Sequence, residues 1–183
     1  MENISLHILD IVENSIRARA KMVSISIEED DAGDLLTIKI EDDGHGMDEE
    51  MLCKVLDPFA TTRTTRRVGL GLSLLAESAR QTGGELTIRS SVGQGTIVKA
   101  LFHSRNIDMK PLGDMINTLM TLVIGNPQVE FLYRHRKGSG DFCLDTLQIK
   151  KELDGLPWSD PDVVKILRQF LQDGFEELGV SFY

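Results

Sequence analysis

Hydrophobic residues recur with two different periods along the first part of the chain. Over residues 6–20 they return every three or four positions, which predicts an amphipathic helix. Around residues 23–27, and again around 36–40, they alternate with polar residues, which is typical of half-buried strands. The polar segment 30–34 separates these two stretches, so the pair is predicted to form a hairpin.

Glycine-rich segments separate the next group of predicted elements. These elements are a short helix at about 49–56, a longer helix that opens at 69–72 and runs to about Gln81, and two strands at 86–89 and 96–102. Gly83 and Gly84 end the longer helix, because glycine readily adopts the backbone conformation that closes a helix. Helices and strands are mixed along the chain, and the predicted fold class is α+β.

The pattern changes after Phe102, and we predict a domain boundary there. The next predicted elements are a helix at about 110–124, two strand-like runs at 128–135 and 141–147, and a last helix that begins at 159–161 and ends near Leu178. We therefore divide the chain into residues 1–103 and a helix–hairpin–helix appendage, 104–183. The last helix carries a wide apolar stripe, which we expect to be buried within the chain, and the alternative is burial against a partner or a second copy.

Composition excludes several classes of partner. The chain has 183 residues and a formal net charge of −9, which argues against general nucleic-acid binding and against anionic membranes, since both need clustered cations. Arg63, Arg66 and Arg67 form one local basic cluster. Cys53 and Cys143 are far apart and not in a metal-ligand spacing, so we expect two reduced thiols in a cytoplasmic protein.

The sequence predicts neither export nor membrane insertion. Residues 1–6 lack the basic segment and apolar run of a signal peptide. The apolar run 119–124 is too short to cross a bilayer. We therefore expect no membrane partner.

Three polar side chains share one face of the first predicted helix. At about 100° per residue, Asn14 lies about 40° from Asp10, and Arg17 lies about 20° from it on the other side. A carboxylate can orient or deprotonate a water, an amide oxygen is a hard ligand for Mg²⁺, and a guanidinium matches phosphate oxygens. The stripe is therefore a candidate metal–phosphate site, and the alternative is a solvated helix face.

A carboxylate beside two glycines follows the second predicted strand. Asp43 precedes Gly44 and Gly46, and its carboxylate can accept a hydrogen bond from the amino group of a flat ring. The glycines would let such a ring approach the backbone without a Cβ clash. The alternative is a simple glycine turn.

Two further glycine segments are candidates for ligand contact. Gly69 and Gly71 open a helix, whose amino end favours anions, and the hydroxyls and cations of 61–67 precede them. Thr96 follows the Gly93–Gly95 turn and can hydrogen-bond an adenine edge or an ordered water. Taken singly, these segments also fit an exposed loop and an ordinary hairpin turn.

The order and spacing of these segments together resemble the GHKL, or Bergerat-fold, ATPase superfamily. Its members include DNA gyrase B subunits, heat-shock chaperone ATPases, histidine kinases and MutL mismatch-repair proteins. Residues 10–15 resemble the N-box, 43–47 the G1 box, 57–59 the F-box, 69–72 the G2 box, and 93–96 the final glycine–threonine box. The resemblance covers about residues 6–102, with 8–48 most similar to MutL and 57–102 to a histidine-kinase catalytic domain.

The resemblance implies a two-layer α/β sandwich, a largely antiparallel sheet covered by helices, that binds ATP and Mg²⁺. Asn14 would coordinate the metal, Arg17 would touch phosphates, and Asp10 would stand in the place of a glutamate base. Asp43 would accept the adenine hydrogen bond, with support from Thr96. The other implied binding residues are Gly44, Gly46, Met47, Phe59, Thr61, Thr62, Arg63, Gly69, Leu70, Gly71 and Leu72, and residues 60–68 would form a mobile lid.

The implied function is ATP–Mg²⁺ binding, with slow hydrolysis or nucleotide-dependent regulation of a partner. Two alternatives stay open: a protein kinase that phosphorylates serine on a partner, and a binding module that does not turn its nucleotide over. We do not expect a self-sufficient histidine autokinase, because few residues precede the first helix and His7 is interpreted as a local cap or solvated side chain. A protein client is expected, and a homodimer is left open.

Overall fold

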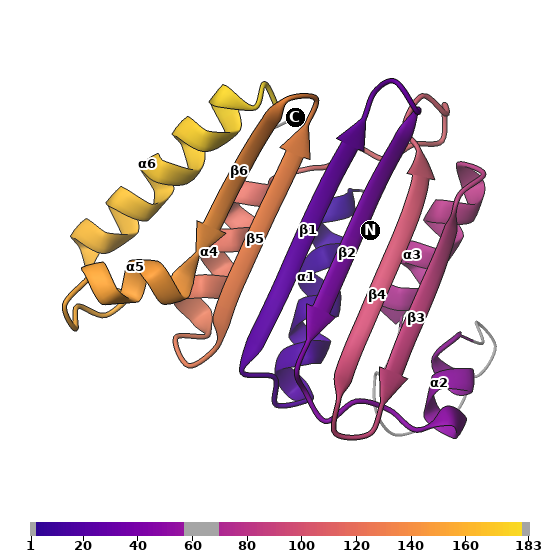
Figure 1. The fold of residues 1–183 in the computed structure, drawn as a ribbon, viewed down its shortest axis with the longest axis horizontal. Coiled ribbons are helices and arrows are strands. Elements are labelled where there is room, and N and C mark those ends of the chain that lie inside the picture. The colour runs from indigo at the N-terminus through magenta and orange to yellow at the C-terminus, as the bar shows by residue number, and fades with distance from the viewer. Residues whose placement is uncertain (1–2, 57–69, 181–183) are drawn as a thin grey trace.

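A computed structural model describes residues 3–56 and 70–180 of the chain. In this part of the chain, six strands form one mixed sheet in the order β3-β4-β2-β1-β5-β6 (Figure 1). Every pair of neighbours is antiparallel except β1 and β5, which run parallel. The sheet and its helices make an α+β fold, as the sequence predicted.

Helices and strands follow one another through residues 3–56 and 70–180. The strands are β1 (Met22–Asp30), β2 (Leu35–Asp42), β3 (Glu85–Ser91), β4 (Gly95–His103), β5 (Glu130–Lys137) and β6 (Gly140–Asp145). The helices are α1 (Ile4–Arg17), α2 (Glu49–Leu56), α3 (Leu70–Gln81), α4 (Met115–Gly125), α5 (Thr146–Glu152) and α6 (Pro161–Glu177).

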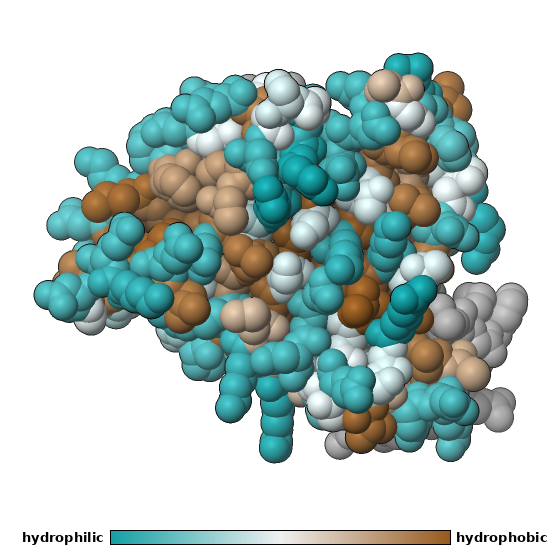
Figure 2. Space-filling view, viewed as in Figure 1, coloured by the Kyte–Doolittle hydropathy of each residue, from teal (hydrophilic) through white to brown (hydrophobic). Residues whose placement is uncertain are grey.

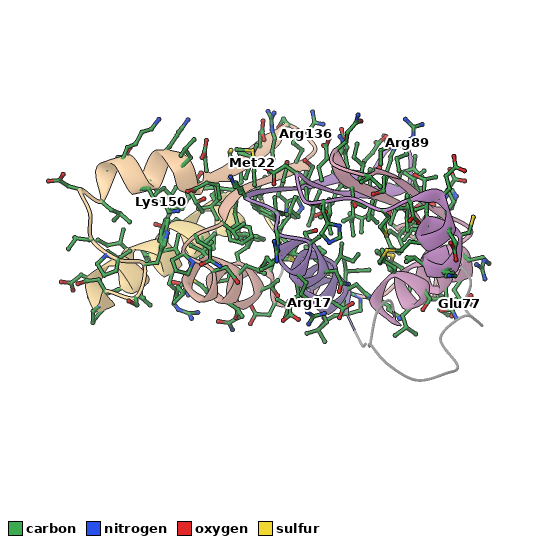
Figure 3. The ribbon with its side chains drawn as sticks, turned by 90° about the horizontal axis from the view of Figure 1, so that it is seen from below. Arg17, Met22, Glu77, Arg89, Arg136 and Lys150 are labelled. Carbon is green, nitrogen blue, oxygen red and sulfur yellow. The ribbon has the colours of Figure 1, made fainter. Side chains whose placement is uncertain are left out.

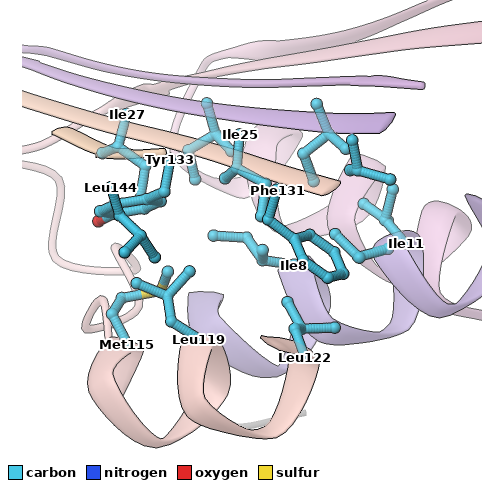
Figure 4. Close-up of a cluster of buried hydrophobic side chains, with 14 of the residues drawn as sticks. Ile8, Ile11, Ile25, Ile27, Met115, Leu119, Leu122, Phe131, Tyr133 and Leu144 are labelled. Atoms are coloured by element: carbon cyan, nitrogen blue, oxygen red, sulfur yellow. The ribbon is translucent and has the colours of Figure 1, made fainter. Parts of the chain in front are cut away.

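The helices α1, α3 and α4 lie on the same side of the sheet (Figures 1 and 3). Alternation along each strand turns the apolar side chains toward these helices, as in β1, where Val23, Ile25 and Ile27 are buried. Figure 4 shows Ile25 and Ile27 packed in one cluster with side chains from α1, α4, β5 and β6. One hydrophobic core therefore fills the space between the helices and one face of the sheet.

The C-terminal region extends the sheet of the N-terminal region. Residues 22–29 of β1 pair with residues 130–137 of β5, and helix α4 packs against α1. The amides of Ile4 and Ser5 donate to the carbonyls of Pro111 and Leu112, at 3.0 and 2.8 Å. Backbone pairing and core packing thus both cross the boundary predicted after Phe102.

The predicted helices and hairpin of the C-terminal region are present, but helix α5 was missed. The alternation over 141–147 predicted a strand that continues past Asp145. In the structure the Asp145 carboxylate accepts from the amides of Leu147 and Gln148, at 2.9 and 3.2 Å. Such N-cap contacts end the strand and begin a helix.

His7 is buried, which corrects its interpretation as a cap or solvated side chain. Its side chain is 0% exposed, and Asn3 is the residue that caps α1, by accepting from the Leu6 amide. Burial, together with the nearby Lys110 ammonium, lowers the pKa of His7 from 6.5 to about 4. The imidazole is therefore neutral at physiological pH and belongs to the core.

The helices within residues 3–56 and 70–180 do not combine the length and the apolar character that a membrane span requires.

Candidate functional site

A cavity of about 390 Å³ opens between helices α1 and α2, the segment after β2, and the N-terminal ends of α3 and β4. This volume lies in the range of sites that take small molecules or cofactors, roughly 300–1,000 Å³. Its walls are formed by Ile11, Asn14, Ser15, Arg17, Ala18, Asp42, His45, Gly46, Met47, Met51, Val55, Leu72, Thr96 and Val98. Hydrophobic side chains dominate, and a few polar groups interrupt them.

Asp42 is the carboxylate in the cavity wall. The Ser15 hydroxyl donates to its Oδ2 at 2.7 Å, and the Gly44 amide donates to its Oδ1 at 2.9 Å. Ser15 is itself buried on α1, so the helix fixes the orientation of the carboxylate. Each carboxylate oxygen can accept a further hydrogen bond, so Asp42 can still accept one from a donor group of a ligand.

Asp43, the acceptor expected from the sequence, lies outside the cavity wall. Its Oδ1 accepts from the backbone amides of Lys21 and Met22, at 2.7 and 2.9 Å, and the residue is exposed. It therefore secures the start of β1. The strand alternation indicates Asp42 in place of Asp43. Ile38 and Ile40 face the core, and Asp42, two residues further on, faces the same side.

Gly46 lets two backbone segments meet beside the cavity. Its φ is +65°, and a Cβ at this position would lie 2.0 Å from the Ser91 carbonyl oxygen. A Cβ on Gly44 would lie 2.8 Å from the Ala18 carbonyl oxygen. The two glycines thus accommodate protein backbone, whereas the sequence predicted that they make room for a flat ring.

Thr96 lines the opposite wall through a hydroxyl network. The Ser90 hydroxyl accepts from the Met47 amide at 2.8 Å and lies 2.9 Å from both the Gly95 carbonyl and the Thr96 hydroxyl. A carbonyl oxygen can only accept, so the single hydroxyl proton of Ser90 goes to Gly95. In this arrangement Thr96 donates to Ser90 and keeps its lone pairs for the cavity. This network also holds Met47 against the cavity.

The polar stripe predicted on the first helix is assembled in the structure. Arg17 donates to the Asn14 amide oxygen and to Glu13, each at 3.0 Å. The Asn14 amide nitrogen lies 3.5 Å from a carboxylate oxygen of Asp10, at the limit of a hydrogen bond. Asn14 and Arg17 reach the cavity wall, whereas Asp10 lies one turn earlier, beside the start of α3.

Gly71 allows α3 to approach Asp10 closely. A Cβ on Gly71 would lie 1.8 Å from the Asp10 Oδ2 and 2.7 Å from its Cγ. The glycine predicted as a phosphate-binding residue therefore also makes room for the candidate base. It lets the first turn of α3 pack against the middle of α1 at one carboxylate.

We expect Gly71→Ala to lower stability, although alanine normally favours a helix by about 1 kcal/mol. The Asp10 carboxylate would have to move, and overpacking of this kind costs about 1–3 kcal/mol. Urea denaturation of a double-mutant cycle with Asp10→Ala measures the coupling, because most of the penalty should vanish in the Asp10→Ala background. Equal penalties in both backgrounds would contradict a contact between the two residues.

Several predicted site residues lie outside the described residues. These are Phe59, Thr61, Thr62, Arg63 and Gly69, together with the expected lid at 60–68. For Leu70 the structure describes the backbone, which begins α3, and Leu72 of the same helix lines the cavity.

Among the described residues of the cavity wall, the sequence predicted fewer than half. The residues missed are Ile11, Ser15, Ala18, Asp42, His45, Met51, Val55 and Val98. Most of them are apolar, and their periodicity on α1, α2 and β4 indicates burial without saying whether a ligand or another side chain covers them. Asp42 alone had a distinct sequence signal, its place in the strand alternation.

The part of the chain that forms the cavity is similar to a known family of proteins. The sequence model of the family described as "Histidine kinase-, DNA gyrase B-, and HSP90-like ATPase" matches residues 3–106. The sensor kinase CckA of Brucella abortus is 38% identical over 82 residues, which is 44% of this chain and 9% of that protein. The non-motile and phage-resistance protein of Caulobacter vibrioides is 30% identical over 118 residues, 60% of this chain and 14% of that protein.

A solved structure shares the fold over nearly the whole chain. The Aquifex aeolicus MutL ATPase domain, which was solved in complex with ADP, aligns with a TM-score of 0.50 and 16% identity. The alignment covers 96% of this chain and 70% of that one. By contrast, this chain spans less than a fifth of the length of the Brucella and Caulobacter proteins.

Proposed function

Because this chain belongs to the family of histidine kinase-, DNA gyrase B- and HSP90-like ATPases, we propose that its cavity binds the adenine of ATP or ADP. The observation that carries the proposal is the Asp42 carboxylate, held by Ser15 and Gly44 in an otherwise largely apolar wall. A carboxylate is an acceptor only, so it selects a ring edge that donates, such as the amino group of adenine. The apolar side chains around it suit the two faces of a flat ring.

The helix stripe supplies the groups that a bound metal–phosphate would need. Asn14 offers an amide oxygen, a hard ligand suited to Mg²⁺, and Asp10 offers a carboxylate one turn away. Arg17 offers a guanidinium at the cavity wall for phosphate oxygens. The metal would neutralise phosphate charge, and Asp10 would orient the water that attacks the terminal phosphate.

We propose slow ATP hydrolysis, or a nucleotide-dependent switch acting on a protein partner, as the activity of this site. Incubation of excess protein with γ-labelled ATP and Mg²⁺ tests it, with Asp42→Asn as the binding-deficient control. Release of free phosphate by the intact chain, and not by the variant, supports hydrolysis. Label transferred to an added partner would instead identify a protein kinase, and ATP that remains bound but intact would identify a non-catalytic module.

Metal dependence should run through Asn14. We expect Asn14→Ala to abolish the increase in ATP affinity that Mg²⁺ brings, and to change adenosine affinity by less than about twofold. The reason is that the amide oxygen would contact the metal and not the base. Isothermal titration of ATP and adenosine, each with and without Mg²⁺, measures both effects.

Asn117 provides a matched control for this prediction. It is an exposed asparagine on helix α4 that does not line the cavity. Asn117→Ala should therefore keep the full Mg²⁺ effect. If Asn14→Ala also keeps it, the stripe on α1 is a solvated helix face.

A further inference from the structure

The face of the sheet opposite α1, α3 and α4 carries charged side chains toward solvent. Figure 3 shows Arg89 and Arg136 pointing away from the side that these helices occupy. Figure 2 views this face, where hydrophilic side chains lie over the middle strands beside hydrophobic ones. The nucleotide cavity lies on the opposite side of the same strands, so the two surfaces are separate.

One row of residues across this face contains three cations and no acid. The strand register places Lys99 of β4 opposite Lys39 of β2, Lys39 opposite Ser26 of β1, and Ser26 opposite Arg134 of β5. All four side chains line a shallow hollow of about 470 Å³. The concentration of positive charge contrasts with the formal net charge of −9 of the whole chain. We call these four residues the cationic row.

The two lysines of the cationic row oppose each other directly. Like charges in this arrangement destabilise an antiparallel pair, because the side chains are close and share one face. Within residues 3–56 and 70–180, Lys99 has no carboxylate within ion-pair distance, whereas Lys39 pairs with Glu41 at 2.5 Å. The sheet thus retains an unfavourable charge pair that an external anion would relieve.

The remaining cations of the hollow are paired, but only through exposed contacts. Arg136 pairs with Glu28 at 3.0 Å, with half of each side chain exposed, and Arg134 pairs with Asp141. The Arg136 pair is of the exposed kind that contributes little to stability, so Arg136 can turn to a carboxylate of a ligand. Arg134 already engages both carboxylate oxygens of Asp141, but a guanidinium has five N–H donors, so it can share the remaining ones with a ligand carboxylate.

We propose that the cationic row docks an extended acidic segment of a partner protein. Lys99 and Arg134 are three strand spacings apart, which is about 14 Å at 4.7–4.9 Å per spacing. In an extended peptide, side chains two residues apart share one face, and four residues span about 13 Å. Three carboxylates at alternate positions thus match the span of the row.

An acidic peptide suits this surface better than a nucleic acid. Glu28 lines the hollow, and Glu41 lies directly beside Lys39, so a continuous phosphate backbone would meet carboxylates on both sides of the row. A peptide with neutral residues between its acids presents charge only where the row is positive. The row also joins strands from both parts of the chain, since β5 lies beyond the matched ATPase region.

The test uses the full chain and a fluorescein-labelled heptapeptide of alternating glutamate and serine. We expect saturable binding by fluorescence anisotropy at 50 mM salt, weakened at least tenfold by the double substitution Lys39→Gln and Lys99→Gln. Lys165→Gln, an exposed lysine on α6, is the matched control and should leave the affinity unchanged. ATP affinity should be the same in all three proteins, because none of these lysines lines the nucleotide cavity.

Three results with the peptides would overturn the proposal. They are no saturable binding of the glutamate peptide, equal binding of a peptide with glutamine in place of glutamate, and undiminished affinity in the double variant. Stronger binding of a twelve-residue oligothymidylate or of inorganic tripolyphosphate than of the peptide would also contradict it, and would identify a phosphate surface. Thermal melting of each variant confirms that any loss of binding occurs in folded protein.

Discussion

Asp42→Asn is expected to weaken the binding of ATP and of ADP by tenfold or more, whereas Asp43→Asn should leave both nearly unchanged. Asp42 lies in the cavity wall, and loss of a hydrogen bond to a charged acceptor costs about 1.5–3 kcal/mol, or about 10- to 150-fold in affinity. The Asp43 carboxylate instead accepts from Lys21 and Met22 on the surface. Isothermal titration of both nucleotides measures the difference between two adjacent carboxylates.

A change of ligand separates loss of recognition from loss of fold. Inosine triphosphate carries a carbonyl oxygen in place of the adenine amino group, so the carboxylate of Asp42 should repel it. We expect the intact chain to prefer ATP strongly, and Asp42→Asn to lose most of this preference, because an amide can donate as well as accept. An unchanged preference in a folded variant would show that Asp42 does not read the adenine edge.

Ser15→Ala provides an intermediate case. The variant keeps the carboxylate but removes the hydroxyl that donates to its Oδ2 at 2.7 Å. We therefore expect a smaller loss of affinity than in Asp42→Asn, and additive effects would argue that Ser15 does not act through Asp42. Ser15 is buried and could be read from the sequence only as a small core residue.

The sequence could predict the elements and one face of the site because both follow from local periodicity. The alternation of Ile38 and Ile40 identified strand β2, and the 3.6-residue period brought Asn14 and Arg17 onto one stripe. The same alternation, continued two residues past Ile40, also places Asp42 on the inner face. Asp43 was predicted as the acceptor because it lies next to the glycines. The strand period is the better guide, because it states which carboxylate faces inward.

The sequence could not predict which strands would be neighbours. Periodicity states which face of a strand is buried, but it does not state which strand lies beside it. The parallel pairing of β1 with β5 joins residues about one hundred positions apart and has no local signal. The cationic row could not be predicted from the sequence for the same reason, since Lys39, Lys99 and Arg134 are brought together only by the strand register.

A chain that ends at Ser104 is expected not to fold, although the sequence predicted a domain boundary after residue 103. Truncation would remove the β5 partner of β1 and the carbonyls of Pro111 and Leu112 that accept from the start of α1. It would also uncover the core that α4 covers (Figure 4), and burial of that apolar area is the main driving force for folding. Circular dichroism and size exclusion measure the outcome, and a folded fragment with full ATP affinity would restore the predicted boundary.

The intact chain offers a second measurement that does not depend on a fragment. Trp158 is the single tryptophan, it is buried, and it lies in the C-terminal region, so its fluorescence reports that region alone. If the chain unfolds as one unit, ATP–Mg²⁺ bound on the other side of the predicted boundary should raise the melting midpoint of Trp158 fluorescence as much as that of circular dichroism. Leu119→Ala, which removes a fully buried side chain of α4, should lower both midpoints together, since such changes cost about 2–5 kcal/mol. Separate transitions, with only one moved by nucleotide, would instead mean that two domains share the sheet.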